Sequence, residues 1–263
     1  MAWKIFSDIH GAYEAVIAQL APDDTAFLLG DYLDLLEFEQ LEGIVPDLVG
    51  RNAVGEALRK AQAGEPGEFR ALVRATLHPG GEHFEALLGR AAGEYDRCLA
   101  SLPCQSYILH GNTDFPDLVR QRCNGTVAFV DGRSIEVDGT RVGFVGGCLQ
   151  TPHALAGEEE TSAYEAKFDA LGQVDVLFMH IPPDLPDITY DVKARRKEAC
   201  SKRAVEYLRD VQPAFVYFGH VHNPRSHTAT LGRTQITNVG YFRRHQRATI
   251  HWRGRGRATE AGR

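Results

Sequence analysis

Short apolar runs alternate along this chain with stretches whose apolar residues recur at helical spacing. Strands are predicted at residues 3–6, 26–29, 106–110, 127–130, 134–137, 142–145, 174–179, 215–218, 227–231 and 234–239. Helices are predicted between them, at residues 12–20, 162–171 and 201–211. Strands that hand over to helices are typical of a layered α/β fold. We therefore predict that residues 1–263 form a single α/β domain.

Residues 35–100 break this alternation. Apolar residues recur there at helical spacing, and Pro46, Pro66 and Pro79 punctuate the stretch. The pattern predicts three or four helices inserted between two strands. Two interpretations stay open, a cap over a site or a peripheral decoration. The chain closes on an arginine-rich segment at residues 243–263, which is expected to be a tail that frays at its end.

Composition places the chain among ordinary globular proteins. Hydrophobic residues make up 43% and charged residues 24%. No stretch of 18 apolar residues occurs, and no apolar run precedes Lys4 and Asp8, so we expect neither a membrane span nor a signal peptide. The five cysteines form no CxxC motif, which favours reduced thiols and a cytoplasmic location. The net charge of −6 argues against a broad nucleic-acid surface.

Five of the apolar runs end in residues that can bind metal. These endings are Asp8-x-His10, Gly30-Asp31, Gly111-Asn112-Thr113-Asp114, His180 and Gly219-His220-Val221-His222. In layered α/β folds, sites collect outside the carboxyl ends of the strands, so all five endings are expected to meet in one patch. Oxygen and imidazole ligands together suit Mn, Fe, Zn, Co or Ni, with Mg less favoured. Taken singly, each residue also has an ordinary interpretation: Asn112 as a turn former and Asp31 as a helix N-cap.

Together, in this order, the five endings resemble the motifs of the calcineurin-like metallophosphoesterase superfamily. The resemblance spans residues 8–222, most of the chain. It implies a four-layer α/β/β/α sandwich with a dinuclear metal site on one edge. It also implies an enzyme that hydrolyses a phosphoester with a metal-bridging hydroxide.

The resemblance also implies a role for each ligand. Asp8, His10 and His222 would hold one metal ion, and Asn112, His180 and His220 the other. Asp31 would bridge the two ions, and Asp31, Asn112 and His220 would belong to the catalytic centre. Two shorter sequences agree with the family pattern: the H-x-P-P form at His180-Ile181-Pro182-Pro183 and the N-x-G form at Asn238-Val239-Gly240.

One position departs from the family pattern. Many members carry a histidine after the motif asparagine, where it is thought to assist the leaving group, but this chain has Thr113. Threonine is no strong general acid, so His110 and His153 are considered as substitutes near the substrate. Asp34 and Asp114 match positions that support the ligands from behind, and Arg225 is a candidate phosphate contact. The basic residues of segment 193–203 are interpreted first as a solvated face.

We therefore predict a phosphodiesterase in preference to a phosphomonoesterase, because Thr113 replaces the expected histidine. The predicted partner is a small phosphorylated molecule, and neither nucleic acid nor a membrane is expected. The alternatives are a phosphomonoesterase acting on a small metabolite or nucleotide, a nuclease, and a protein-binding scaffold of the same fold. The oligomeric state is not predicted.

Overall fold

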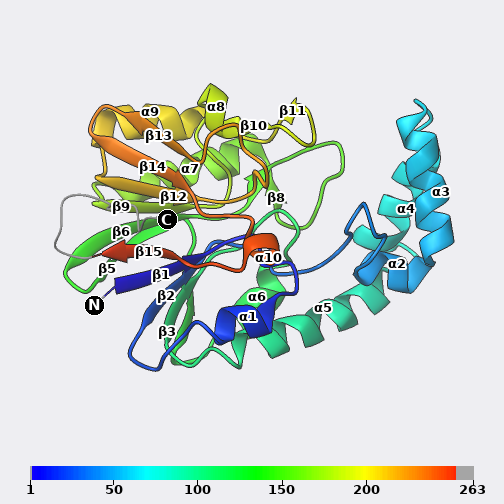
Figure 1. Cartoon of the computed structure of the whole chain (residues 1–263), viewed down its shortest axis with the longest axis horizontal. Helices are drawn as coiled ribbons and strands as arrows, with labels where there is room; N and C mark the ends of the chain where they lie inside the picture. Colours follow the sequence, from blue (N-terminus) through cyan, green and yellow to red (C-terminus); the bar gives the residue numbers. More distant parts are fainter. Residues whose placement is uncertain (1, 253–263) are drawn as a thin grey trace.

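Two β-sheets lie face to face at the centre of the molecule, and helices cover their outer faces (Figure 1). The computed structural model describes residues 2–252. Apolar side chains fill the space between the two sheets and the space between each sheet and its helices. The predicted α/β class is confirmed, and the order of layers is helix, sheet, sheet, helix.

The first sheet carries three of the five motif-bearing strands. Its order is β15-β1-β2-β3-β4, and its strands are β1 (Ala2–Phe6), β2 (Thr25–Leu28), β3 (Gln105–Ile108), β4 (Val127–Phe129) and β15 (Thr249–Trp252). Strands β1 to β4 run parallel, and β15 pairs antiparallel with β1. The carboxyl ends of β1, β2 and β3 therefore lie side by side.

The second sheet carries the other two motif-bearing strands, β9 and β12. Its order is β13-β14-β12-β9-β6-β5. The bounds are β5 (Arg133–Val137), β6 (Thr140–Val145), β9 (Val176–Met179), β12 (Phe215–Phe218), β13 (Thr228–Leu231) and β14 (Thr234–Asn238). The four central strands run parallel, and the edge strands β5 and β13 are antiparallel to their neighbours.

Side-chain alternation explains how each strand serves two layers. Ile5 and Phe27 point into the space between the sheets, whereas Phe6 and Leu28 point toward the helices. Phe27 stacks on Phe178 of the opposite sheet, with ring centroids 4.4 Å apart. Because successive side chains of a strand face opposite ways, the apolar residues 26–28 of β2 and all four residues of β9 are buried on both faces.

The outer helices pack on the sheets through apolar faces. Helices α1 (Tyr13–Ile17), α5 (Phe84–Leu99) and α6 (Pro116–Gln121) cover the first sheet, and α7 (Thr161–Leu171) and α9 (Lys202–Val211) cover the second. Helix α9 begins at a capping residue, because the Ser201 hydroxyl accepts a hydrogen bond of 3.0 Å from the amide of Ala204.

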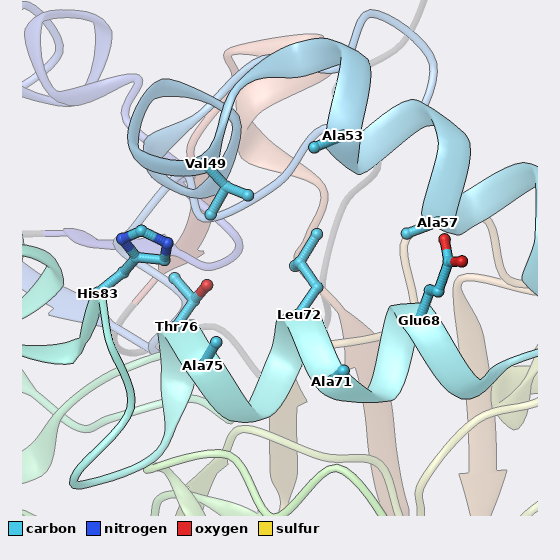
Figure 2. A pocket seen from close by; sticks show the side chains of 9 residues that line it. All are labelled: Val49, Ala53, Ala57, Glu68, Ala71, Leu72, Ala75, Thr76 and His83. Carbon is cyan, nitrogen blue, oxygen red and sulfur yellow. The ribbon is translucent and has the colours of Figure 1, made fainter.

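The predicted helical insertion is present, but its last helix belongs to the body. Helices α2 (Ile44–Val49), α3 (Arg51–Gln62) and α4 (Gly67–Leu77) project to one side of the sheets (Figure 1). The long α5 runs back from them, and its Tyr95 and Leu99 are buried in the core. A groove of about 310 Å³ lies between α3 and α4 (Figure 2). Helices α2, α3 and α4 and the segment before α5 supply its walls, and no motif residue lines it.

Six short elements lie in the connections: β7 (Cys148–Leu149), β8 (Glu158–Glu159), α8 (Pro186–Thr189), β10 (Tyr190–Asp191), β11 (Arg196–Lys197) and α10 (Phe242–His245). The arginine-rich segment expected as a tail is folded as far as residue 252, because it forms most of α10 and all of β15. An edge strand escapes pattern analysis here because Trp252 is 60% exposed and only His251 faces the core. The rest of that segment lies outside the described residues.

None of the helices within residues 2–252 is long and apolar enough to cross a lipid bilayer. The five cysteines are free thiols, and three of them, Cys98, Cys104 and Cys148, are buried.

Candidate metal centre

The five predicted strand endings meet at one place. Asp8, Asp31 and Asn112 follow β1, β2 and β3 of the first sheet, and His180 and His220 follow β9 and β12 of the second. The amide of His220 donates 3.0 Å hydrogen bonds to the carboxylate of Asp8, although 212 positions separate them. The convergence predicted from the sequence is therefore confirmed.

Four side chains form the first ligand group. Asp8, His10, Asp31 and His222 each direct one ligand atom into a space in which these atoms lie within 4.8 Å of one another. His10 Nε2 lies 3.4 Å from His222 Nε2. Asp8 Oδ1 is 3.5 Å from His222 Nε2, and Asp31 Oδ2 is 3.8 Å from His10 Nε2.

The second ligand group lies on the other side of Asp31. It comprises Asp31, His180 and His220, and Asn112 reaches into it. Asn112 Oδ1 lies 3.1 Å from His180 Nε2 and 2.9 Å from His220 Nδ1. Asp31 Oδ1 is 3.6 Å from His180 Nε2, so each oxygen of Asp31 faces a different group.

Backbone carbonyls orient two of the imidazoles. His10 Nδ1 lies 2.9 Å from the carbonyl of Leu33, and His180 Nδ1 lies 2.8 Å from the carbonyl of Leu29. A carbonyl only accepts hydrogen bonds, so each Nδ1 carries a proton, and in the neutral imidazole each Nε2 turns its lone pair toward the ligand group. Metal-binding histidines are commonly fixed in this way.

The arrangement fits divalent cations. The lone pair of His180 Nε2 faces the carbonyl oxygen of Asn112, and that of His10 Nε2 faces Asp31. Such contacts between acceptors are unfavourable in a buried site unless a cation lies among them. Mixed carboxylate, amide and imidazole ligands suit borderline divalent metals. The Asp8–His10–Asp31–His222 and Asp31–His180–His220 groups can therefore hold metal ions.

Burial and the neighbouring charges shift the pKa values of four of these side chains. Burial opposes ionisation of Asp8 and Asp31, but the adjacent imidazoles hold the pKa of both carboxyls below the usual value. Burial lowers the pKa of His220 to about 3, so its imidazole is neutral at pH 7. The pKa of His222 is raised against the effect of burial, because Asp8 accepts its hydrogen bond.

Four of the candidate ligands have an uncommon backbone conformation with positive φ. Asp8, His10, Asp31 and His220 have φ values of 54°, 39°, 56° and 67°. Positive φ is uncommon for residues other than glycine and is concentrated at functional sites, where surrounding structure enforces it. The sharp bends after β1, β2 and β12 turn these side chains toward one another.

Asp114 and Thr113 support Asp31 from behind. Asp114 Oδ2 accepts 2.8 Å hydrogen bonds from the amides of Asp31 and Gly111, so it ties the loop after β2 to the loop after β3. The Thr113 hydroxyl donates to Asp31 Oδ1 at 2.8 Å. Asp34 pairs with Arg243 of α10, whose guanidinium also donates to the carbonyl of His10.

The three residues expected to contact substrate lie outside the ligand groups. His110 is buried and directs Nε2 toward Glu159. His153 is exposed in the β7–β8 loop, where its ring packs on Phe69 of α4. The guanidinium of Arg225 lies 4.5 Å from the ring centre of Tyr190. A substrate-binding role for His110, His153 and Arg225 stays a prediction.

A charged network around His110 escaped sequence analysis. Its other members are Asp131, Glu159 and Lys167, which no motif connects. Ligand atoms of His110, Asp131 and Glu159 come close enough to hold a metal ion. The Lys167 ammonium, however, lies 2.7 Å from Asp131 and 2.5 Å from Glu159, where such an ion would bind. Lys167 therefore acts as the cation of this network.

Replacing Lys167 with methionine is expected to lower the free energy of unfolding by about 2–4 kcal/mol, because two largely buried carboxylates lose their cation. Burial raises the pKa of Asp131 and Glu159, but their partners hold both values below normal. Their contribution to stability is present above the unfolded-state pKa and is lost as pH falls. The effect of the substitution should therefore shrink below about pH 4.

Urea unfolding at pH 7 and at pH 3.5 measures this effect. Lys60→Met is the matched control, because Lys60 forms exposed ion pairs with Glu56 and Glu68 and should change stability by less than about 1 kcal/mol. Equal losses for the two variants at pH 7 would show that Lys167 does not balance a buried charge.

Many solved structures share the fold, and two of them show the extent of the likeness. One aligns at a TM-score of 0.60 and 12% identity, covering 95% of this chain and 98% of the other. The crystal structure of TT1561 of Thermus thermophilus aligns at a TM-score of 0.54 and 12% identity, covering 95% and 97%. No protein-family model matches the sequence, and the curated proteins yield no significant match. At this identity the likeness concerns the fold alone, which by itself implies no activity.

Proposed function

We propose that the protein is a phosphoester hydrolase that uses two divalent metal ions. The observation that carries the proposal is the position of Asp31, whose two oxygens face two separate ligand groups. A shared carboxylate between two histidine-containing groups is the arrangement expected for paired ions. Asp8, His10 and His222 would hold one ion, Asn112, His180 and His220 the other, and Asp31 both.

Paired divalent ions supply a nucleophile from water at neutral pH and neutralise the charge that develops on a phosphoryl group. The chain contributes a rigid, largely buried frame: Asp8 and His180 are fully buried and Asp31 is 3% exposed. His222 has a side chain 31% exposed and His10 one 12% exposed, so the centre opens to solvent on their side. A phosphoester would approach from that side. Mn, Fe, Zn, Co and Ni suit these ligands.

We further propose a preference for phosphodiesters over phosphomonoesters. Thr113 follows the motif asparagine, a position at which many proteins of the resembled superfamily carry a histidine. Its hydroxyl proton is engaged with Asp31, so it does not protonate a leaving group. The substrate is proposed to be small, and the five free cysteines agree with the proposed cytoplasmic location. A phosphomonoesterase remains the second candidate, and a scaffold is disfavoured because every ligand position carries a competent residue.

The test compares hydrolysis of bis(4-nitrophenyl) phosphate with that of 4-nitrophenyl phosphate, with added Mn²⁺ and again with EDTA. We expect faster cleavage of the diester, loss of activity in EDTA and loss of activity in His222→Ala. His227→Ala is the control, because His227 is an exposed histidine of the loop that follows His222. Faster cleavage of the monoester would overturn the diester preference. Cleavage of neither ester with any metal would overturn the hydrolase and favour the scaffold.

A further inference from the structure

Tyr241 packs flat against one of the ligands. Its ring is stacked on the imidazole of His222, with centroids 4.0 Å apart and an interplanar angle of 2°. The ring of His10 packs edge-on against the same tyrosine, with ring centroids 5.9 Å apart and an interplanar angle of 77°. Tyr241 precedes α10 and is 19 positions from His222, so the folded chain creates this contact.

The turn before Tyr241 is braced against the loop that carries His222. The side chain of Asn238 accepts a 3.0 Å hydrogen bond from the amide of Gly240. It also donates a 2.9 Å hydrogen bond to the carbonyl of Val221, the residue between His220 and His222. One side chain therefore fixes both the Tyr241 turn and the ligand loop.

The segment after Tyr241 is anchored to the other ligand-bearing loop. The amides of Phe242 and Arg243 donate 3.1 Å hydrogen bonds to the carbonyls of Ser7 and Asp8. Phe242 is fully buried. Because both flanks of Tyr241 are held, its ring has a fixed place over His222.

His222 needs such a contact more than His10 and His180 do. The Nδ1 atoms of His10 and His180 are held by backbone carbonyls. Within residues 2–252, the hydrogen-bonding and charged contacts of His222 all involve Nε2, the atom that faces Asp8 and His10. No hydrogen bond at Nδ1 therefore sets the plane of this ring, and the Tyr241 stack takes that role.

We propose that Tyr241 is a positioning residue that orients His222 for metal binding. The inference rests on the proposed metal centre but not on which ester is cleaved. Some residues do not bind the metal but orient a side chain that does. Removing such a residue typically lowers metal affinity 10- to 100-fold. We expect loss of the flat ring at position 241 to weaken one Mn²⁺ site by about tenfold. The site that contains His180 and His220 should be unaffected.

Calorimetric titration of Mn²⁺ into the metal-free full chain tests the inference. Tyr241→Leu keeps the side-chain bulk but removes the stack, and Tyr241→Phe keeps the stack but removes the hydroxyl. We expect the leucine variant to lose about tenfold in affinity at one site and the phenylalanine variant to bind as the wild type does. Tyr190→Leu is the control, because Tyr190 packs under Arg225 rather than on a ligand. Thermal unfolding shows whether each variant is folded.

A spectroscopic signature separates orientation from general stability. In the metal-free protein, a ring stacked flat on His222 should shift the imidazole carbon-bound protons of His222 upfield. These signals should stay in place in Tyr241→Phe and move downfield in Tyr241→Leu. Unchanged signals and unchanged Mn²⁺ affinity in Tyr241→Leu would overturn the inference, and so would an equal loss of affinity in both variants.

The binding results for Tyr241 can be distinguished from the results for ester hydrolysis. Wild-type protein that binds Mn²⁺ and cleaves an ester, with no change in Tyr241→Leu, would overturn this inference alone. Weakened binding in Tyr241→Leu without cleavage of any ester would support the inference and overturn the proposed function. A wild-type protein that binds no Mn²⁺ would overturn both.

Discussion

Replacing Asp31 with asparagine is expected to abolish paired metal binding and to reduce phosphoester hydrolysis by roughly 10³-fold or more. Asp31 is the one side chain common to the two ligand groups. The substitution keeps the shape of the side chain but removes its negative charge and replaces one ligand oxygen with an amide group. Both groups lose a charged ligand at once, so the effect should exceed that of removing a ligand from one group.

Metal content and initial rate, measured on the same samples, check this prediction. The control is Asp23→Asn, because Asp23 is an exposed carboxylate before β2. The amide and the hydroxyl of Thr113 both donate hydrogen bonds to Asp31, and the substitution alters these contacts. Thermal unfolding therefore checks that the variant is folded. An Asp31→Asn protein that retains wild-type rates with Mn²⁺ would contradict a bridging role.

Replacing Gly111 with alanine should damage the second ligand group although glycine carries no ligand atom. A Cβ at this position would lie 2.2 Å from Asp31 Oδ1 and 2.6 Å from His180 Cε1. Neither side chain can retreat easily, because Thr113 binds Asp31 and the carbonyl of Leu29 holds His180. The methyl group therefore separates two ligands, and we expect at least about a 10²-fold loss of hydrolysis.

Metal titration and initial rates distinguish this local effect from general unfolding. Gly125→Ala is the matched control, because a Cβ at Gly125 would meet no atom within 4 Å. Gly111→Ala should lose one Mn²⁺ site and retain a cooperative thermal transition. Full occupancy of both sites in this variant would show that the loops adapt to the methyl group.

The strand endings could be predicted because each couples a buried apolar run to a polar residue at a turn. Asp31 and His180 follow strands whose apolar residues are continuous, so the sequence indicates both the strand and the point where it ends. Parallel strands then bring the endings to one edge, whatever their distance along the chain. The ligand groups and the layered α/β class were predictable for this reason.

Other features depend on contacts between side chains that no local pattern encodes. Lys167 meets Asp131 and Glu159 only after α7 packs beside β5. Tyr241 reaches His222 because the Asn238 turn and the Ser7–Asp8 backbone fix its flanks. Strand β15 pairs with a single neighbour, β1, so it lacks the apolar run of a buried strand. The sequence around Lys167, Tyr241 and β15 contains neither a spacing nor a motif that indicates these roles.

Hydrophobic periodicity alone does not show where the helical insertion ends and the α/β body resumes. Helical spacing predicts helices across residues 35–100 without indicating which of them leave the body. Tyr95 of α5 donates a 3.1 Å hydrogen bond to Asp114, the carboxylate that ties the loops of Asp31 and Asn112 together. The last inserted helix therefore supports the candidate metal centre from within the core. For α2, α3 and α4, both interpretations stay open, a cap over the site and a peripheral decoration.

Anomalous diffraction from a crystal grown with Mn²⁺ shows directly whether the two ligand groups each hold an ion. We expect two peaks, one bonded to Asp8, His10, Asp31 and His222 and the other to Asp31, Asn112, His180 and His220. No peak should lie among His110, Asp131 and Glu159, because Lys167 supplies the cation there. An empty centre, or a single peak within the His110 network, would rule out a paired metal centre at Asp31.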